Sequence, residues 1–380
     1  MLTAIALCAV GAEKTVSNEL RKLNIKVNES GFGRVKFLAD REGLYRALIG
    51  LRAADRLLLE VGYFLAPDFD ALFEGTRQQA WEDYIPPRLG LKVTKVRTNR
   101  SALSAKTSIQ AVVHKAAAER LCAKRRINRL PEHGEEAELR VYIEKDQASV
   151  LLDLSGAPLF KRGYRLKGGI APLRETTAAA MILHSGWKRK FPLYDPFCGS
   201  GTIAIEAAMY AWDIAPGIGR SFAIEHLSLG DRDTARKVRE EFIGKIDLSR
   251  LTRIAGSDSD AASVAAATAN LQKAFALAAL KPEDPPSFRV LPMDKAKAPY
   301  EGEGGFIITN PPYGRRLADT ESAEKNYSEM AKMALNFKGW KLALITDNPG
   351  FESFFGKKAD SCREITNGAI NSYLYQYEIL

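Results

Sequence analysis

A polar residue followed by two prolines and an aromatic residue, Asn310-Pro311-Pro312-Tyr313, directly follows an apolar, strand-like segment at 305–309. Two consecutive prolines exclude a helix and fix a rigid, extended turn. The side-chain oxygen of Asn310 and the backbone carbonyl of Pro311 could accept both hydrogens of an exocyclic amino group, while Tyr313 stacks on its ring. Such acceptors would aim the nitrogen lone pair at an electrophilic methyl group. Alone, the segment could equally be an ordinary Pro-Pro turn after a strand. Together with the glycine turn and strand-end acids described next, it predicts methyl transfer to an aromatic amine, a reaction that requires neither a metal nor a nucleophilic residue.

A short glycine turn lies earlier in the chain, at 195–202 (Asp-Pro-Phe-Cys-Gly-Ser-Gly-Thr), between an apolar strand and a helix. It is not a phosphate-binding P-loop, because no Gly-Lys-Ser/Thr follows, and it lacks the third glycine of the dinucleotide fingerprint. An acid at the strand end before such a turn suits S-adenosylmethionine (AdoMet), which offers an α-amino group and has no pyrophosphate. The predicted AdoMet contacts here are Asp195, Phe197, Gly199, Gly201 and Thr202.

Acids also end the two following strands. Asp258, with Ser259 beside it, could accept the ribose hydroxyls of a nucleoside, but Asp258 or Asp260 could equally cap the next helix. Asp294 could take an adenine amino group, as could many acids at strand ends. With strand order 3-2-1-4-5, the loops after strands 1 and 4 lie side by side at the carboxyl edge of the sheet. Asn310 would then border the AdoMet site as well.

The elements that position these residues alternate between strand and helix, which predicts a doubly wound α/β sheet of Rossmann type. The last two predicted strands flank Asn367-Gly368, a tight-turn pair, and form an antiparallel hairpin. An irregular insert separates the second helix from the second strand. The predicted helices are 174–185, 202–212, 260–278, 322–337 and 350–355, and the predicted strands are 191–195, 252–257, 288–292, 305–309, 340–346, 361–366 and 371–379.

The N-terminal part predicts two α+β units. A strand at 2–10, a helix at 12–23, strands at 25–29 and 33–38 turned at Ser30-Gly31, a helix at 41–51 and a strand at 56–64 give a ferredoxin-like order. The second unit has helices at 69–75, 78–84 and 107–123, a strand at 89–97 with imperfect alternation, and strands at 137–144 and 148–154 turned at Lys145-Asp146. The predicted domains are 1–65, 66–165 and 166–380.

The formal net charge of +9 is concentrated in one part of the chain. Residues 88–129 hold twelve basic residues and one acid, Glu119. Such an imbalance in a folded segment favours a nucleic-acid partner over a merely solvated helix face. The candidate RNA-binding residues are Lys92, Lys95, Arg97, Arg100, Lys106, Lys124, Arg125 and Arg126.

The cysteines, the histidines and the apolar segments argue against several classes of protein. The four cysteines are far apart and form no Cys-x-x-Cys pair, and the four histidines have no metal-ligand spacing, so neither a metal site nor a disulfide framework is expected. The apolar start has no basic flank and predicts a buried strand rather than a signal peptide. No apolar run is long enough for a membrane span. A cytoplasmic protein with no membrane partner is expected.

Over its whole length the sequence resembles the bacterial 23S rRNA guanine-N2-methyltransferase family. Residues 172–380 look like a class I methyltransferase with an Asn-Pro-Pro-Tyr loop, and residues 66–165 resemble a THUMP domain, including Leu103-Ser104. The segments 161–165 and 171–175, with Arg165 and Pro172, are similar to the family's motif beside the methionine end of AdoMet. The insert 214–222 also looks like that family.

The resemblance implies the following roles. Asp195, Gly199 and Gly201 would contact AdoMet, Asp258 its ribose, Asp294 its adenine, and residues 310–313 the target guanine. The enterobacterial members carry a second methyltransferase domain that this sequence lacks, so a second modification is not expected. Arg315-Arg316 stand where the family usually has an acid, so the contacts of the target loop are expected to differ from those of the family.

Other functions share parts of this pattern. A tRNA guanine-N2 methyltransferase is the nearest alternative, and a DNA adenine-N6 methyltransferase has the same loop and chemistry. A protein methyltransferase acting on glutamine amides would not need a basic RNA-binding half. A non-catalytic RNA-binding ribosome assembly factor would not need intact glycine and Asn-Pro-Pro-Tyr loops.

Overall fold

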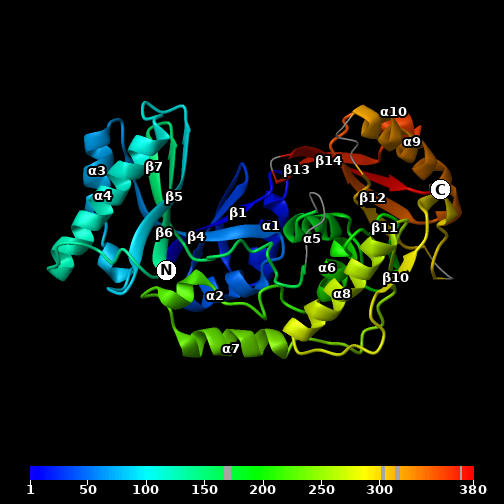
Figure 1. Ribbon diagram of the computed structural model, residues 1–380, viewed down its shortest axis with the longest axis horizontal. Coiled ribbons are helices and arrows are strands. Elements are labelled where there is room, and N and C mark those ends of the chain that lie inside the picture. Colours follow the sequence, from blue (N-terminus) through cyan, green and yellow to red (C-terminus); the bar gives the residue numbers. More distant parts are fainter. Residues whose placement is uncertain (167–172, 301–303, 313–316, 369) are drawn as a thin grey trace.

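The chain builds two seven-stranded sheets, one from its N-terminal and one from its C-terminal part (Figure 1). The computed structural model describes residues 1–166, 173–300, 304–312, 317–368 and 370–380. The strands of the first sheet end at residue 153, and those of the second begin at residue 193. Within the described ranges, no helix is both long and apolar enough to cross a membrane.

The first sheet has the strand order β2-β3-β1-β4-β7-β6-β5. Its first four strands and two helices follow the ferredoxin-like order, as predicted. β4 pairs antiparallel with β7, from Leu58 opposite Asp153 to Leu65 opposite Gln147. The two predicted N-terminal units therefore share one continuous sheet. Its strands are β1 (Leu2–Cys8), β2 (Lys26–Gly31), β3 (Arg34–Ala39), β4 (Ala54–Leu65), β5 (Gly90–Asn99), β6 (Glu136–Glu144) and β7 (Gln147–Asp153).

Helices cover one face of this sheet, and the alternation of each strand sends every second side chain into the core beneath them. In α4, Gln110 and His114 also contact the carbonyl oxygens of Val93 and Leu91 on the edge strand β5, at 2.6 and 3.1 Å. These contacts occupy hydrogen-bonding groups at an otherwise open sheet edge. The helices are α1 (Glu13–Lys22), α2 (Arg41–Gly50), α3 (Phe69–Arg77) and α4 (Lys106–Arg125).

The opposite face of the first sheet holds a small apolar cluster of Ile5, Leu58, Tyr142 and Leu151. Charged side chains surround this cluster. The carboxylate of Asp153 lies between two arginines, at 2.6 Å from Arg56 and 3.2 Å from Arg140. This face is therefore a layer of ion pairs rather than a second core.

Three local predictions in this half need correction. The β2–β3 turn lies at Phe32-Gly33, where Gly33 has φ +68°, and Ser30-Gly31 end the strand instead. Of the predicted helix 78–84, only a short 3-10 turn forms, at Trp81–Asp83. The register of β5 against β6 shifts between Val93 and Lys95, and this bulge explains the imperfect alternation at 89–97.

The second sheet has the order β10-β9-β8-β11-β12-β14-β13, which confirms the predicted 3-2-1-4-5 arrangement. Its first five strands are parallel, and β13 and β14 form the predicted antiparallel hairpin at one edge. Its strands are β8 (Leu193–Asp195), β9 (Ile254–Asp258), β10 (Ser287–Val290), β11 (Phe306–Thr309), β12 (Lys341–Thr346), β13 (Ser361–Asn367) and β14 (Ile370–Glu378).

The helices of this half include one that the sequence analysis missed. The supposedly irregular insert contains α7, capped by Asp231 and burying Ala235, Val238 and Phe242. α7 packs against α2 of the first half, below it in the view of Figure 1. The helices are α5 (Glu175–His184), α6 (Thr202–Ala211), α7 (Arg232–Ile243), α8 (Ala261–Leu277), α9 (Leu317–Ala334) and α10 (Phe351–Phe355), with 3-10 turns at Ala223–His226, Met293–Lys295 and Leu335–Phe337.

A group of four charged residues joins the two halves, and three of them, Arg52, Arg162 and Glu206, are buried. Arg162, in the segment between the sheets, contacts the carboxylate of Glu206 on α6 and the backbone oxygen of Arg52. Arg52 in turn donates to the backbone oxygen of Ile214 at 2.7 Å. Glu19 on α1 accepts from the backbone nitrogen of Arg52 at 2.9 Å, and burial raises the pKa of Glu19. Opposite charges thus balance one another where the halves meet.

Candidate active site

The predicted glycine turn connects β8 to α6, and both of its glycines have left-handed backbone. Gly199 has φ +49° and Gly201 has φ +82°. A β-carbon on Gly201 would lie 3.0 Å from the side chains of both Ala267 and Phe288, so this position also needs glycine for packing. Gly201 precedes the first turn of α6 without a side-chain cap. The turn therefore brings backbone close to any ligand at the start of this helix.

Hydrogen bonds from Arg165 connect this turn to the start of α5 and the residues just before it. Its Nη1 donates to the Ser200 hydroxyl and its Nη2 to the Thr202 hydroxyl, both at 3.0 Å. Its Nε donates to the Glu175 carboxylate at 3.0 Å, and Nη2 also reaches the backbone oxygen of Leu173. The geometry therefore gives Arg165, predicted as a cofactor contact, a positioning role in the loop.

Asn270 is a buried polar residue at this site that the sequence analysis missed. Its side chain donates to the backbone oxygen of Ser200 at 3.0 Å and accepts from the backbone nitrogen of Leu166 at 3.0 Å. It lies on the buried face of α8, three residues after Ala267 and one before Leu271. A lone amide on an otherwise apolar helix face was the available signal.

The structure gives different roles to Asp258 and Asp260, the two acids that could have capped α8. Asp260 is the N-cap and accepts from the backbone nitrogens of Ala262 and Ser263. Asp258 instead ends β9, and its Oδ2 accepts from the backbone nitrogen of Gly199 at 2.9 Å. Asp258 thus ties the end of the second strand to the glycine turn.

The other predicted cofactor contacts lie around this edge. Ser259 is exposed, and exposed Asp294 contacts its neighbour Lys295 at 3.3 Å. The backbone nitrogen of Phe197 donates to Oδ1 of Asp195 at 3.1 Å. Pro172 lies outside the described residues.

Asp195 connects the glycine turn to the Asn-Pro-Pro segment. Its Oδ1 accepts a 2.6 Å hydrogen bond from the hydroxyl of Thr309, the last residue of β11. Both residues are buried, and β8 and β11 are neighbouring parallel strands. Burial is the main cause that raises the pKa of Asp195 to about 7, and the charge of Asp258 also raises it. Two carboxylates therefore lie close together at the strand ends.

The Asn-Pro-Pro segment leaves this same edge of the sheet. Asn310 is half-buried, Pro311 is buried and Pro312 is exposed. Tyr327 of α9, whose hydroxyl lies 2.9 Å from that of Thr346 at the end of β12, reaches the backbone oxygen of Pro312 at 3.5 Å. Tyr313, Arg315 and Arg316 lie outside the described residues. In the part of the chain that the structure describes, no three His, Cys, Asp or Glu side chains are placed to hold a metal ion.

The predicted RNA-binding cations do not gather at one place. The ring of Tyr142, which belongs to the helix-free face of the first sheet, lies 5.7 Å from the guanidinium of Arg97. Lys106 begins α4, and Lys124 and Arg125 end it about 28 Å away, at 1.5 Å per helical residue. The candidates are therefore distributed over the sheet face carrying Lys92, Lys95 and Arg97, the loop end with Arg100 and Lys106, and the helix end with Lys124, Arg125 and Arg126.

Comparisons with known proteins show the family to which the chain belongs. Residues 162–376, more than half of the chain, match the family model described as "RMKL-like, methyltransferase domain". The chain belongs to this methyltransferase family. Residues 3–58 match the RlmL ferredoxin-like domain and residues 66–153 the THUMP domain. AdoMet is the methyl donor of this fold class.

Two curated relatives illustrate the similarity. The "Putative RNA methyltransferase YpsC" of Bacillus subtilis is 36% identical, over 99% of this chain and 95% of the relative. The "Ribosomal RNA large subunit methyltransferase K/L" of Syntrophotalea carbinolica is 33% identical, over 97% of this chain and 52% of the relative. The chain thus spans about half the length of the K/L relatives it matches.

Two solved structures match this RMKL-like methyltransferase over nearly their full lengths. SMU.472, described as a putative methyltransferase complexed with SAH, is 35% identical with a TM-score of 0.90, covering 100% of this chain and 98% of its own. A protein from Listeria monocytogenes, described as a predicted N6-adenine-specific DNA methylase, is 37% identical with a TM-score of 0.90, covering 99% and 96%.

We expect Arg165→Lys to weaken AdoMet binding about tenfold, because lysine cannot reproduce the forked contacts with Ser200, Thr202 and Glu175. Titration calorimetry with AdoMet measures this dissociation constant. Arg189→Lys is the matched control, since Arg189 contacts Asp213 and the ring of Tyr210 instead. An unchanged dissociation constant in Arg165→Lys would refute the positioning role.

Proposed function

We propose that this protein transfers the methyl group of AdoMet to the exocyclic N2 of a guanine in RNA, with 23S rRNA as the substrate. The hydrogen bond between Asp195 and Thr309 is the observation that carries the proposal. It joins the turn that would hold the donor to the strand that presents Asn310. Adjacent parallel strands thereby bring the donor and acceptor loops to one edge.

The residues of the acceptor loop suit an aromatic amine, which is a poor nucleophile because its lone pair is delocalised into the ring. The side-chain oxygen of Asn310 and the backbone oxygen of Pro311 would accept its two hydrogens. This pairing favours a tetrahedral nitrogen whose lone pair faces the donor. Catalysis then depends on positioning and on electrostatic stabilisation of the charge that develops on the nitrogen.

The donor side suits a ligand with positive charge. Asp195 and Asp258 would face the cationic groups and the ribose, and the first turn of α6 offers backbone nitrogens to a carboxylate. AdoMet supplies an electrophilic methyl group on a sulfonium when it is bound. Arg165 and Asn270 keep the glycine turn in the shape that receives it. Asp294 is proposed as the contact of the adenine amino group.

The choice of RNA rests on the first half of the chain. Residues 66–153 match a THUMP domain, and residues 88–129 carry the excess of basic side chains. The printed names of the YpsC and K/L relatives refer to RNA and to large-subunit ribosomal RNA. A DNA adenine-N6 activity remains the second candidate, because the Listeria structure carries that description.

We expect AdoMet affinity to fall as the pH drops below about 7. Asp195, with its pKa raised to about 7, is mostly protonated below that pH in the free protein, whereas a bound cation favours its carboxylate. Binding must then release a proton, so affinity should decrease by up to about tenfold per pH unit below 7 and level off above it. Calorimetry between pH 5.5 and 8.0 measures the trend.

The control for this pH dependence is Asp195→Asn, which keeps an acceptor for Thr309 but cannot ionise. It should bind AdoMet more weakly and with little dependence on pH in the same range. A flat profile for the unmodified protein would contradict a contact between Asp195 and a cationic group of the donor.

The proposed activity is tested by transferring labelled methyl from AdoMet to RNA, and in parallel to DNA, of cells that lack this protein, followed by nucleoside analysis. Label in N2-methylguanosine of large-subunit rRNA is the expected result. Label only in tRNA would change the substrate, and label in N6-methyladenine of DNA would select the second candidate. AdoMet binding without transfer to any nucleic acid would leave a protein substrate or a non-catalytic role in ribosome assembly.

A further inference from the structure

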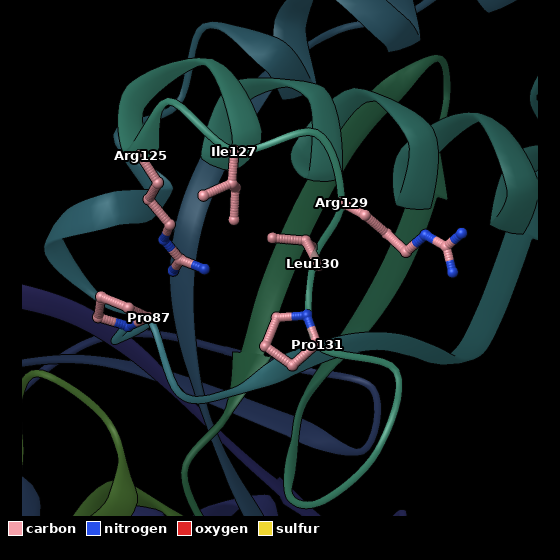
Figure 2. A pocket seen from close by; sticks show the side chains of 6 residues that line it. All are labelled: Pro87, Arg125, Ile127, Arg129, Leu130 and Pro131. Carbon is pink, nitrogen blue, oxygen red and sulfur yellow. The ribbon is translucent and has the colours of Figure 1, made fainter.

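A surface pocket of about 580 Å³ lies at the C-terminal end of α4 (Figure 2). It lies in the region that matches the THUMP domain, beside the first sheet. The candidate active site lies at the edge of the second sheet. Figure 2 shows the side chains of Arg125, Ile127 and Leu130 directed into one space, whereas Arg129 points away from it. The lining residues are Pro87, Arg125, Ile127, Arg129, Leu130 and Pro131.

The guanidinium of Arg125 offers an unsatisfied donor at this pocket. Its Nη2 donates to the backbone oxygen of Ile85 at 2.5 Å. Its Nη1 is buried and has no hydrogen-bond partner among the described residues. A guanidinium carries only donors, and a buried donor without an acceptor is unfavourable. Since Nη1 has almost no accessible surface, a ligand with carbonyl, ring-nitrogen or phosphate acceptors would satisfy it after a small rotation of the guanidinium into the pocket.

The rim of the pocket is positively charged. The segment 124–131 carries four basic residues and no acid. Arg126 is exposed and forms no ion pair with any residue that the structure describes, and Lys124 has only a 3.8 Å contact with Glu82. Exposed cations of this kind attract the phosphates of a polyanion.

The walls of the pocket are apolar, which phosphate binding alone does not require. The rings of Pro87 and Pro131 and the side chains of Ile127 and Leu130 line it. Ile127 keeps 38% of its surface exposed. Flat, apolar-edged groups such as nucleobases can pack against such walls, and the volume lies in the range of roughly 300–1,000 Å³ that holds small organic ligands.

We propose that this pocket binds one unpaired nucleotide of the RNA, with the base between the apolar walls and its acceptors at Arg125. The proposal rests on the RNA-binding role given to this half under the proposed function. A paired base would be stacked inside its helix and could not enter, so the nucleotide must be bulged or single-stranded. Arg126 and Lys124 would hold the neighbouring phosphates. The pocket would thereby position the RNA relative to the active site.

The test compares two RNA hairpins, one with a three-nucleotide bulge and the same hairpin fully paired. Fluorescence anisotropy with the full chain measures both dissociation constants. We expect the bulged hairpin to bind about tenfold more tightly, which is the effect of one hydrogen bond to a charged group. Arg125→Met, which removes the donors, should reduce this preference to less than about twofold.

Ile127→Trp is a second variant, which fills the pocket and leaves Arg125 in place. Because Ile127 is partly exposed, this change should not disturb the core, and unchanged thermal unfolding verifies it. It should also abolish the preference for the bulge. Arg129→Met is the matched control: Arg129 also lines the pocket, but Figure 2 shows its guanidinium directed away from the space between Ile127 and Leu130, so the change should weaken binding of both hairpins equally.

Two outcomes would overturn the proposal. They are equal binding of both hairpins by the unmodified protein and a preference for the bulge that survives both pocket variants. The assay involves no methyl transfer. A protein that prefers the bulge but methylates no RNA would therefore count against the proposed function alone.

Discussion

Asn310→Ala is expected to lower the rate of methyl transfer by about 10²–10³-fold while changing the AdoMet dissociation constant by less than about threefold. The variant removes one of the two acceptors that would hold the amino group, and lost stabilisation of developing charge has an effect of this size. The backbone oxygen of Pro311 would remain. Single-turnover transfer to rRNA and calorimetry with AdoMet measure the two quantities separately.

The matched control for this prediction is Asn310→Asp, which keeps a side-chain acceptor at the same position. It should retain more activity than Asn310→Ala. Thr309, which holds Asp195 from the preceding position, is unchanged in both variants. If Asn310→Ala lost AdoMet binding and transfer equally, the residue would belong to the donor site rather than to the acceptor loop.

The candidate site was predictable largely because its residues stand at the ends of strands. The carboxyl ends of parallel strands meet at one edge, so the strand order 3-2-1-4-5 was enough to bring Asp195 and Asn310 together. The sequence did not indicate that a hydrogen bond from Thr309 to Asp195 joins the two loops. A hydroxyl directly before the Asn-Pro-Pro segment was the available signal, but threonine is common in strands.

The contacts that hold the glycine turn could not be predicted from the sequence. Arg165 and Asn270 approach the turn from segments that lie 35 and 70 residues from Ser200 in the chain. Their partners depend on how α5 and α8 pack on the sheet. Periodicity within one element carries no information about these distant pairs.

The missed helix α7 has a different cause. Arg232–Ile243 is highly charged and buries only Ala235, Val238 and Phe242, so its apolar stripe is narrow. The spacing of three and four residues and the cap at Asp231 were nevertheless present. Its role is visible only in three dimensions, because it packs on α2, about 190 residues earlier in the chain.

Glu206→Ala is expected to destabilise the protein by about 3–5 kcal/mol, because it leaves Arg162 buried without its partner. Both side chains are almost completely buried, at 2% and 0% exposure. Tyr164 would also lose the acceptor of its hydroxyl, which lies 3.2 Å from Glu206. With the unfolding entropy expected for this length, the midpoint should fall by about 5 °C. Differential scanning calorimetry measures the shift.

Two controls distinguish the effect of leaving a buried charge unpaired from the effect of losing an ion pair of any kind. Asp233→Ala removes the partner of Arg236 in a pair that is 85% and 69% exposed, and it should change stability by less than about 1 kcal/mol. The double variant Arg162→Met with Glu206→Met should be more stable than Glu206→Ala, since it removes both buried charges and fills their volume. If Glu206→Ala behaved like Asp233→Ala, the contact between Arg162 and Glu206 could not be what holds the two halves together. If the double variant lost as much as the sum of its single changes, packing rather than charge would explain the loss.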